Sequence, residues 1–307
     1  MKRVLIGIDW GGTFLKLGIF NLRGKLLNKY KLSSGDFSKP SKFFKSLKKV
    51  IEAILRSKKL DLSKVEGVGV GAPGIINTEE GFIYYLPNIK GWRNFPFKAV
   101  FEEEFGLPLA LDNDANLAAL AELKRGQAKG VRNAVLFTLG TGLGSGLILN
   151  GRVFRGGTSS SEAAHFPMSF RGRKCSCGSR GCIETFLGSK YIVKEAKKFF
   201  GNRVASPKDL YQLALQGQRK ALKVWENFGY RLGVFSAGLI NLLDLELIVL
   251  SGGVSKAFRF FREGMKRAIR ERALFPFLKK VKIKVSKLKE EAGIIGAYEF
   301  IKAETND

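Results

Sequence analysis

Three cysteines and one histidine lie close together in this sequence and are the only residues of their kinds in it. Cys175, Cys177 and Cys182 fall within eight consecutive residues, and His165 lies ten positions before the first of them. Three thiolates and one imidazole make a complete tetrahedral zinc shell. Buried apolar thiols or a disulfide are the alternatives, but three thiols leave one over in any disulfide pairing. We therefore predict a structural zinc site, without the open position that metal-based catalysis requires.

Two glutamates bracket this predicted metal site. Glu162 precedes His165 by three residues, and Glu184 follows Cys182 by two. Binding of the four ligands to one ion would draw both carboxylates into one small region. A histidine that binds zinc through one ring nitrogen keeps its other N–H as a donor. Two acceptors and one donor suit a polyhydroxylated small molecule, whereas most glutamates simply face solvent.

Length and composition predict a globular protein of two domains. The chain has 307 residues, more than the usual size of one domain, and is 45% hydrophobic, which excludes disorder. It contains no run of eighteen apolar residues and begins without the pattern of a signal peptide. Clustered thiols with metal-binding spacing fit a reducing compartment. We expect a cytoplasmic protein without a membrane span.

The sequence is strongly basic. It has 53 Lys and Arg against 27 Asp and Glu, a net charge of +26, which favours polyanionic partners such as nucleic acid or phosphorylated substrates. The excess is spread along the chain, because in the predicted helix at 41–59 the basic residues fall mostly opposite an apolar face. We interpret the charge as a property of the whole surface and do not expect nucleic acid as a partner. A zinc-ribbon nucleic-acid binder is the alternative that the charge favours.

A strand, glycine turn, strand, tight turn, strand pattern occurs twice. The first copy begins with VLIGIDW and turns at Gly11–Thr13, and the second begins near Ala134 and turns within GTGLGSG. The repeat predicts a duplicated unit at the start of each domain. Neither turn leads into a helix, which excludes a dinucleotide fingerprint and a P-loop. Glycine hairpins can still cradle phosphate with backbone N–H groups, and a third turn, Gly252–Gly253, does lead from a strand into a helix.

Acidic and amide residues follow two predicted strands at the edge where open α/β sheets bind ligands. Asp9 ends the first strand and could hold magnesium between phosphates or stabilise the turn through its own side chain. Asp112, Asn113 and Asp114 follow an apolar strand and precede a helix. A helix N-cap requires only one of these three residues. The trio therefore indicates a ligand site at this edge.

The sequence resembles the ROK family of sugar kinases, repressors and open reading frames, and its bacterial glucokinase branch most. The resemblance covers about residues 4–300 and rests on the segments DWGGTFLKLG, GAPG, LPNIKGW, DNDAN, GTGLGSG, EAAH, CSCGSRGC with IE, and LIVLSGGVS in this order. It implies an α/β fold of two actin-like (ribonuclease H-like) domains with a cleft between them. We assign residues 1–116 plus 291–307 to the smaller domain and residues 117–290 to the larger, zinc-containing one.

The resemblance also implies transfer of the ATP γ-phosphate to a hexose hydroxyl, as in a glucokinase that forms hexose 6-phosphate, with Mg accompanying ATP. Asp114 would be the catalytic base. Residues implied to bind the sugar are Gly74, Asn88, Asn113, Asp114, Glu162, His165 and Glu184. Residues implied to bind the nucleotide are Asp9, Gly11, Gly12, Thr13, Gly140, Thr141, Gly142, Gly252 and Gly253. The basic surface makes polyphosphate an alternative donor, and the family implies a homodimer or homotetramer.

Two points leave alternatives open. The family also contains transcriptional regulators, and a sugar-sensing protein without kinase activity is therefore the second interpretation. Family repressors carry an N-terminal helix-turn-helix, which we do not expect here because the first predicted strand begins by residue 4. Family members usually have glycine at the position of Ala164. If that position needs a positive φ, alanine costs about 1 kcal/mol there.

Overall fold

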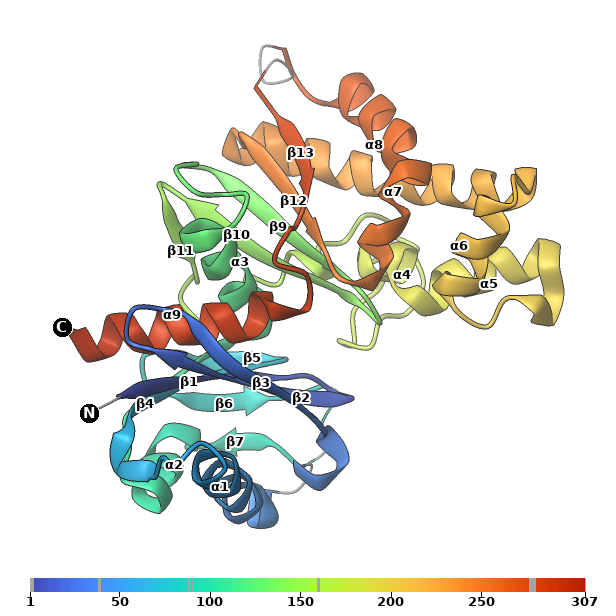
Figure 1. The fold of residues 1–307 in the computed structure, drawn as a ribbon. Coiled ribbons are helices and arrows are strands. Elements are labelled where there is room, and N and C mark those ends of the chain that lie inside the picture. Colours follow the sequence, from blue (N-terminus) through green and yellow to red (C-terminus); the bar gives the residue numbers. More distant parts are fainter. Residues whose placement is uncertain are drawn as a thin grey trace. The chain divides into compact units, whose positions relative to one another are not determined.

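The computed structural model shows an α/β fold (Figure 1) and describes residues 3–37, 40–87, 89, 91–158, 161–275 and 280–306. Asn88, one of the predicted sugar ligands, lies outside the described residues. The chain divides into two compact units. Unit 1 consists of Met1–Gly126, Val153–Ser161 and Glu290–Asp307, and unit 2 consists of Gln127–Arg152 and Glu162–Lys289.

Unit 1 is built on a five-stranded mixed sheet with the order β3-β2-β1-β4-β8. Its first three strands form antiparallel pairs, whereas β1, β4 and β8 run parallel. The bounds are β1 Val4–Trp10, β2 Phe14–Asn21, β3 Leu26–Ser33, β4 Val65–Ala72 and β8 Leu109–Asn113. A smaller antiparallel sheet consists of β5 Ile75–Asn77, β6 Phe82–Tyr85 and β7 Arg93–Phe95.

Helices cover both faces of the unit 1 sheet. Helix α9 packs against β1 and β4, while α1 and α2 lie on the opposite face (Figure 1). The predicted helix in the forties forms as α1 and buries Phe43, Leu47 and Ile51. Trp10 packs against Phe43 and Trp92, with ring centroids 4.4 and 4.9 Å apart, in the core directly behind the first glycine turn. The helices are α1 Pro40–Arg56, α2 Phe97–Phe105, α3 Asp114–Arg125 and α9 Ala292–Asn306.

Unit 2 repeats this sheet layout with the order β11-β10-β9-β12-β13. Again an antiparallel pair, β9 and β10, is continued by parallel strands, β12 and β13. The duplication predicted from the two glycine turns is therefore confirmed at the level of strand order. The strands are β9 Ala134–Leu139, β10 Leu143–Leu149, β11 Arg152–Phe154, β12 Leu247–Ser251 and β13 Lys282–Val285.

One face of the unit 2 sheet packs against a helical layer. Val135, Phe137 and Leu250 share a core with residues of α7 and α8, which lie side by side (Figure 1). The helices of this unit are α4 Glu184–Leu187, α5 Ser189–Phe200, α6 Pro207–Leu215, α7 Arg219–Leu243 and α8 Phe258–Arg272.

The two compact units differ from the predicted domain limits mainly in two segments. Helix α3 groups with unit 1 because it packs against α9, whereas the sequence interpretation began the larger domain at residue 117. The segment Val153–Ser161 also groups with unit 1. The functional domain limits and the cleft between the domains stay predictions.

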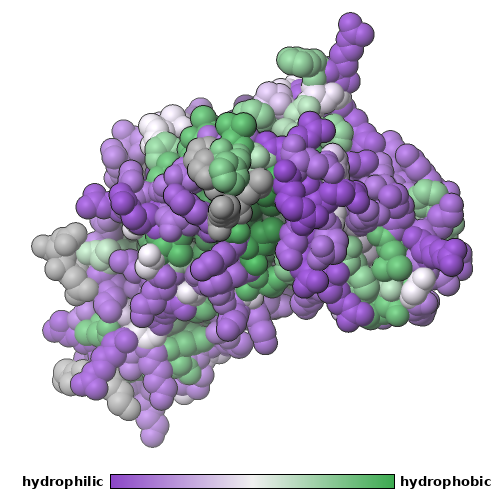
Figure 2. All heavy atoms as spheres, turned by 90° about the horizontal axis from the view of Figure 1, so that it is seen from above, coloured by the Kyte–Doolittle hydropathy of each residue, from purple (hydrophilic) through white to green (hydrophobic). Residues whose placement is uncertain are grey.

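The surface carries the basic excess. None of the Lys and Arg residues in the described chain is buried, and the face shown in Figure 2 is largely hydrophilic. No helix of the described chain combines the length and apolarity that crossing a membrane requires. The charge distribution agrees with a basic surface and does not single out one tail.

Candidate functional site

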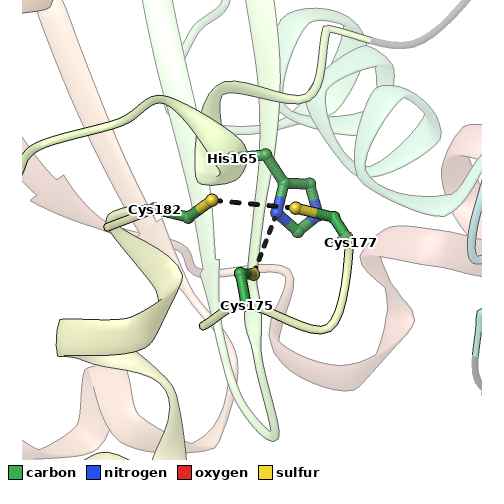
Figure 3. Close-up of side chains that lie close together, drawn as sticks. All are labelled: His165, Cys175, Cys177 and Cys182. Carbon is green, nitrogen blue, oxygen red and sulfur yellow. Dashed lines mark hydrogen bonds between the residues drawn. The ribbon is translucent and has the colours of Figure 1, made fainter. Parts of the chain in front are cut away.

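His165, Cys175, Cys177 and Cys182 point toward one another from one irregular segment of unit 2 (Figure 3). Their potential ligand atoms all lie within 4.8 Å of one another. His165 ends a short 3-10 turn, and Cys175 accepts a backbone hydrogen bond from Gly178 in a tight turn. An isolated bridge between Pro167 and Cys182 brings the far end of the segment back. The predicted metal ligands are therefore assembled, and the cluster can hold a metal ion.

The spacing of the four ligand atoms fits a tetrahedral ion. The sulfurs of Cys177 and Cys182 are 3.7 Å apart, and the sulfur of Cys175 lies 3.6 Å from Nδ1 of His165. Bonds of about 2.3 Å to sulfur and about 2.0 Å to nitrogen give tetrahedral edges of about 3.8 and 3.5 Å. Burial, together with the neighbouring sulfurs, raises the pKa of Cys182 to about 12 when no cation balances them. A bound cation would reverse this by favouring the thiolates.

The two predicted carboxylates lie beside the cluster. Nε2 of His165 is 4.0 Å from Oε2 of Glu162, and Oε1 of Glu184 is 4.0 Å from the sulfur of Cys175. If Nδ1 binds an ion in the cluster, Nε2 would carry the N–H that remains for a ligand. Burial raises the pKa of Glu162, an effect that His165 opposes and the charge of Glu184 reinforces. Two acceptors and one donor thus lie close together, as the spacing predicted.

Ala164 introduces no backbone strain. It lies in the 3-10 helix Ala163–His165, and its φ is not in the positive range. Its side chain is fully buried in the core of unit 2. The condition under which alanine would be costly at this position is therefore not met.

Glu184 also touches the second glycine turn, a contact that the sequence did not predict. Its Oε2 accepts a hydrogen bond of 3.2 Å from the backbone N–H of Leu143. A Cβ on Gly142 would come within 2.3 Å of the same oxygen, so only glycine allows this approach. The first residue of α4 thus joins the cysteine segment to the turn at Gly140–Gly142.

The two predicted nucleotide segments of unit 2 are neighbours. Strands β9 and β12 run parallel with Ser251 paired to Thr138, so the turns at Gly140 and Gly252 follow adjacent strands at the same sheet edge. Gly252 has a φ of +85°, and a Cβ there would meet the carbonyl oxygen of Leu139 at 2.4 Å. The strand continues through a 3-10 turn into α8, which gives the strand-to-helix geometry that the sequence indicated.

In unit 1, Asn113 is the helix cap of the predicted trio. Its side-chain oxygen accepts backbone hydrogen bonds from Ala115 and Asn116, at 2.8 and 3.3 Å. Its side-chain nitrogen donates to the carbonyl oxygen of Gly74 at 3.0 Å. Asp114 follows as the first residue of α3. Asn113, Asp114 and Gly74 are therefore brought together at the carboxyl ends of β8 and β4.

Asp112, which precedes these residues, is fully buried and fully engaged. Its Oδ1 accepts hydrogen bonds from the backbone of Asn113 and from side chains of Asn116 and Thr78, at 2.7, 2.9 and 3.1 Å. Its Oδ2 accepts a bond of 2.8 Å from Nε of Arg155. Burial raises the pKa of Asp112, and the charge of Arg155 counteracts this. No local pattern in the sequence singled out Arg155 among the 53 Lys and Arg residues.

The first glycine turn lies on the same sheet edge. Asp9 is in register with Gly71 on β4, and Gly71 is in register with Asp112 on β8. Lys16 donates a hydrogen bond of 3.1 Å to Oδ2 of Asp9. The backbone of Gly11 closes the hairpin by donating to the carbonyl of Phe14 at 3.0 Å. Asp9 thus lies in the last two residues of β1, near the predicted strand end, with a cationic neighbour that was not anticipated.

Comparison with known proteins identifies the family. The profile of the ROK family matches residues 5–304 of this chain. The chain belongs to the ROK family. A glucokinase from Halalkalibacterium halodurans is 32% identical to this ROK protein, over 99% of its chain and 96% of the glucokinase.

Solved structures of both enzymes and regulators of the family resemble this ROK protein. A ROK family transcriptional regulator, a homolog of the E. coli MLC protein, gives a TM-score of 0.89 at 26% identity, with 99% of this chain and 79% of the regulator covered. A ROK family glucokinase from Streptomyces griseus, in complex with glucose and AMPPNP, gives 0.81 at 27% identity, with 96% and 98% covered. The fold is thus that of the family, and both functional classes share it.

Proposed function

We propose that this ROK protein is an ATP-dependent hexose kinase, with glucose as the first substrate to test. The observation that carries the proposal is the group at the end of β8, where Asn113 caps α3 and bonds to Gly74, and Asp114 is the first residue of the helix. The similarity to a glucokinase at 32% identity supports it. A carboxylate at a strand end, held next to an amide that is already fixed, is suited to orient a sugar hydroxyl.

In the proposed reaction, Asp114 accepts the proton of a hexose hydroxyl as its oxygen attacks the γ-phosphorus of ATP and ADP leaves. Phosphoryl transfer depends mainly on positioning and charge neutralisation, for which one carboxylate suffices as base. Asn113 and Gly74 would bind the same sugar. We propose the 6-hydroxyl as the acceptor, because the similarity to glucokinases supports a glucokinase-type reaction.

The remaining sugar contacts would come from the residues beside the metal cluster. Glu162 and Glu184 offer carboxylates and His165 offers its Nε2–H. Zinc is the ion we propose for the cluster, because three thiolates and one imidazole with these spacings suit it. The ion would stabilise the segment and take no part in phosphoryl transfer, since its shell is filled by protein.

The glycine turns would bind the phosphates. We assign Gly11, Gly12 and Thr13 in unit 1, Gly140–Gly142 in unit 2, and Gly252–Gly253 for the adenosine end. Asp9 would hold Mg²⁺ with the phosphates, either directly or through water. Its present partner Lys16 would also attract phosphate oxygens.

A coupled assay with a panel of hexoses tests the proposal. Glucose, mannose, fructose, allose and N-acetylated hexosamines are each combined with Mg²⁺ and either ATP or polyphosphate. We expect ATP-dependent turnover of at least one hexose. Turnover with polyphosphate would add this donor, and activity with ATP alone would exclude it. Absence of turnover with every pair would contradict a kinase.

A sugar-sensing regulator is the second candidate, favoured by the similarity to a ROK transcriptional regulator at a TM-score of 0.89. It predicts hexose binding without turnover and without a need for Asp114. Calorimetric binding of the same hexoses, measured beside the assay, separates the two. Binding without ADP release would favour the regulator.

A further inference from the structure

The ion pair between Asp112 and Arg155 lies near the proposed sugar ligands and has no role in the proposed reaction. Asp112 is fully buried, and the Nε of Arg155 donates to its Oδ2 at 2.8 Å. The guanidinium also lies over the ring of Phe300 in α9, 4.9 Å from its centroid. Arg155 is therefore fixed by a carboxylate of β8 and by an aromatic ring of α9, all within unit 1.

Arg155 belongs to the short connection Val153–Ser161, which groups with unit 1 although unit 2 precedes and follows it. The chain passes into unit 2 between Ser161 and Glu162. Two of the proposed sugar ligands therefore follow this connection closely in the sequence: Glu162 is the next residue, and His165 comes three residues later. The partner of Arg155, Asp112, precedes Asn113 and accepts a hydrogen bond of 2.7 Å from its backbone N–H.

We propose that the Asp112–Arg155 pair is a positioning element for hexose binding. By fixing residues 153–158 to the end of β8, it holds the chain segment that leads into Glu162 and His165, and it holds Asp112 beside Asn113. Neither residue of the pair needs to touch the sugar. The inference rests on the proposed function and adds to it two residues that would act only by positioning the sugar ligands.

A purely structural role and a positioning role make different predictions, because a buried carboxylate without its partner destabilises a fold whatever it positions. Removing Arg155 alone leaves the charge of Asp112 uncompensated. Removing both charges relieves that burial cost but leaves the connection unfixed. If the pair positions ligands, stability recovers in the double variant and hexose affinity does not.

Arg125 provides a matched control. It too pairs with a carboxylate, that of Glu299, and lies over an aromatic ring of α9, 4.9 Å from the centroid of Tyr298. Unlike Arg155, it lies at the end of α3 and does not lead into a sugar ligand. Arg125→Met thus removes the same kind of interaction in the same unit.

The experiment compares wild type, Arg155→Met, Asp112→Asn/Arg155→Met and Arg125→Met in the full chain. Calorimetry measures affinities for D-glucose, or for the best hexose of the panel, and for AMPPNP. Thermal unfolding measures stability, and hydrogen exchange measures protection of residues 153–158. We expect both Arg155 variants to bind hexose at least about tenfold more weakly, with AMPPNP affinity unchanged and faster exchange at 153–158.

Three results would overturn the proposal. They are a hexose affinity that recovers together with stability in the double variant, an equal loss in Arg125→Met, and unchanged exchange at 153–158. Wild-type binding with an unaffected Arg155→Met would reject the positioning role alone. Failure of wild type to bind any hexose of the panel would instead reject the proposed function, and with it this inference.

Discussion

The two groups of proposed sugar ligands are held by different kinds of structure. Asn113 and Asp114 lie where a buried strand meets a helix, and backbone and side-chain hydrogen bonds fix Asn113. Glu162 and His165 lie in a segment of short turns and isolated bridges, and His165 is one of the four potential metal ligands there. The first group is organised by regular secondary structure, whereas the second lies around a cluster that can hold a metal ion. Their sensitivity to mutation and to chelation should differ accordingly.

The largest effect should come from Asp114→Asn. We expect kcat to fall about 10³-fold or more, because the amide cannot accept the hydroxyl proton. Hexose affinity should fall much less than kcat, and thermal stability should stay near wild type because Asn113 still caps α3. Steady-state kinetics with ATP and calorimetry check both. Full turnover in this variant would remove the base assignment.

Cys177→Ser should break the second group and spare the first. We expect loss of bound zinc and a strong loss of hexose affinity, with AMPPNP affinity retained, because the ion organises the segment that carries Glu162 and His165. Elemental analysis and calorimetry measure these quantities. Ser179→Ala, an exposed neighbour in the same segment, is the control and should retain the metal. Unchanged hexose affinity in metal-free protein would contradict the distinction between the groups.

Asn113 variants sharpen the account of the first group. Asn113→Ala removes both the cap and the bond to Gly74 and should lower the free energy of unfolding by about 1–2 kcal/mol. Asn113→Ser keeps a cap acceptor but loses the donor to Gly74, so it should recover the part of the stability that the cap contributes. Urea unfolding with chelator and without it measures the change. If the loss of stability in these variants changes when chelator removes the metal, the two groups of proposed sugar ligands are not independent.

Gly142→Ala should have the smallest effect of the four. The added methyl group would lie 2.3 Å from Oε2 of Glu184, so that side chain must move. We expect a modest loss of hexose affinity without loss of zinc. Gly238→Ala in α7 is the control, because a Cβ there meets nothing within 4 Å. Equal behaviour of the two variants would show that the approach of Glu184 to the turn is not needed.

Local sequence signals predicted much of the fold and the candidate site. The repeated glycine turns predicted the duplicated sheet because hairpin geometry is set within a few residues. The spacing of the cysteines and the histidine predicted that they come together, because three thiols and one imidazole this close in sequence match the ligand set of a tetrahedral metal site. The DND trio predicted a cap and a ligand edge, and Asn113 is that cap.

Contacts between distant segments were the part that the sequence did not predict. Arg155 pairs with Asp112 across 43 positions, and one arginine among 53 basic residues carries no local mark. Glu184 reaches Leu143 across 41 positions, so its contact with the turn was equally hidden. The grouping of helix α3 with unit 1 was hidden for the same reason, since its packing against α9 brings together residues far apart in the chain.

The packing of α9 on β1 and β4 has a consequence for how the protein is made. The first strands of the chain leave the ribosome early, but the helix that covers them is encoded at Ala292–Asn306. The face of the unit 1 sheet that α9 covers therefore stays exposed while unit 2 is synthesised. Nascent chains should recruit chaperones during this interval, and stop codons placed just before residue 290 should yield an aggregating product.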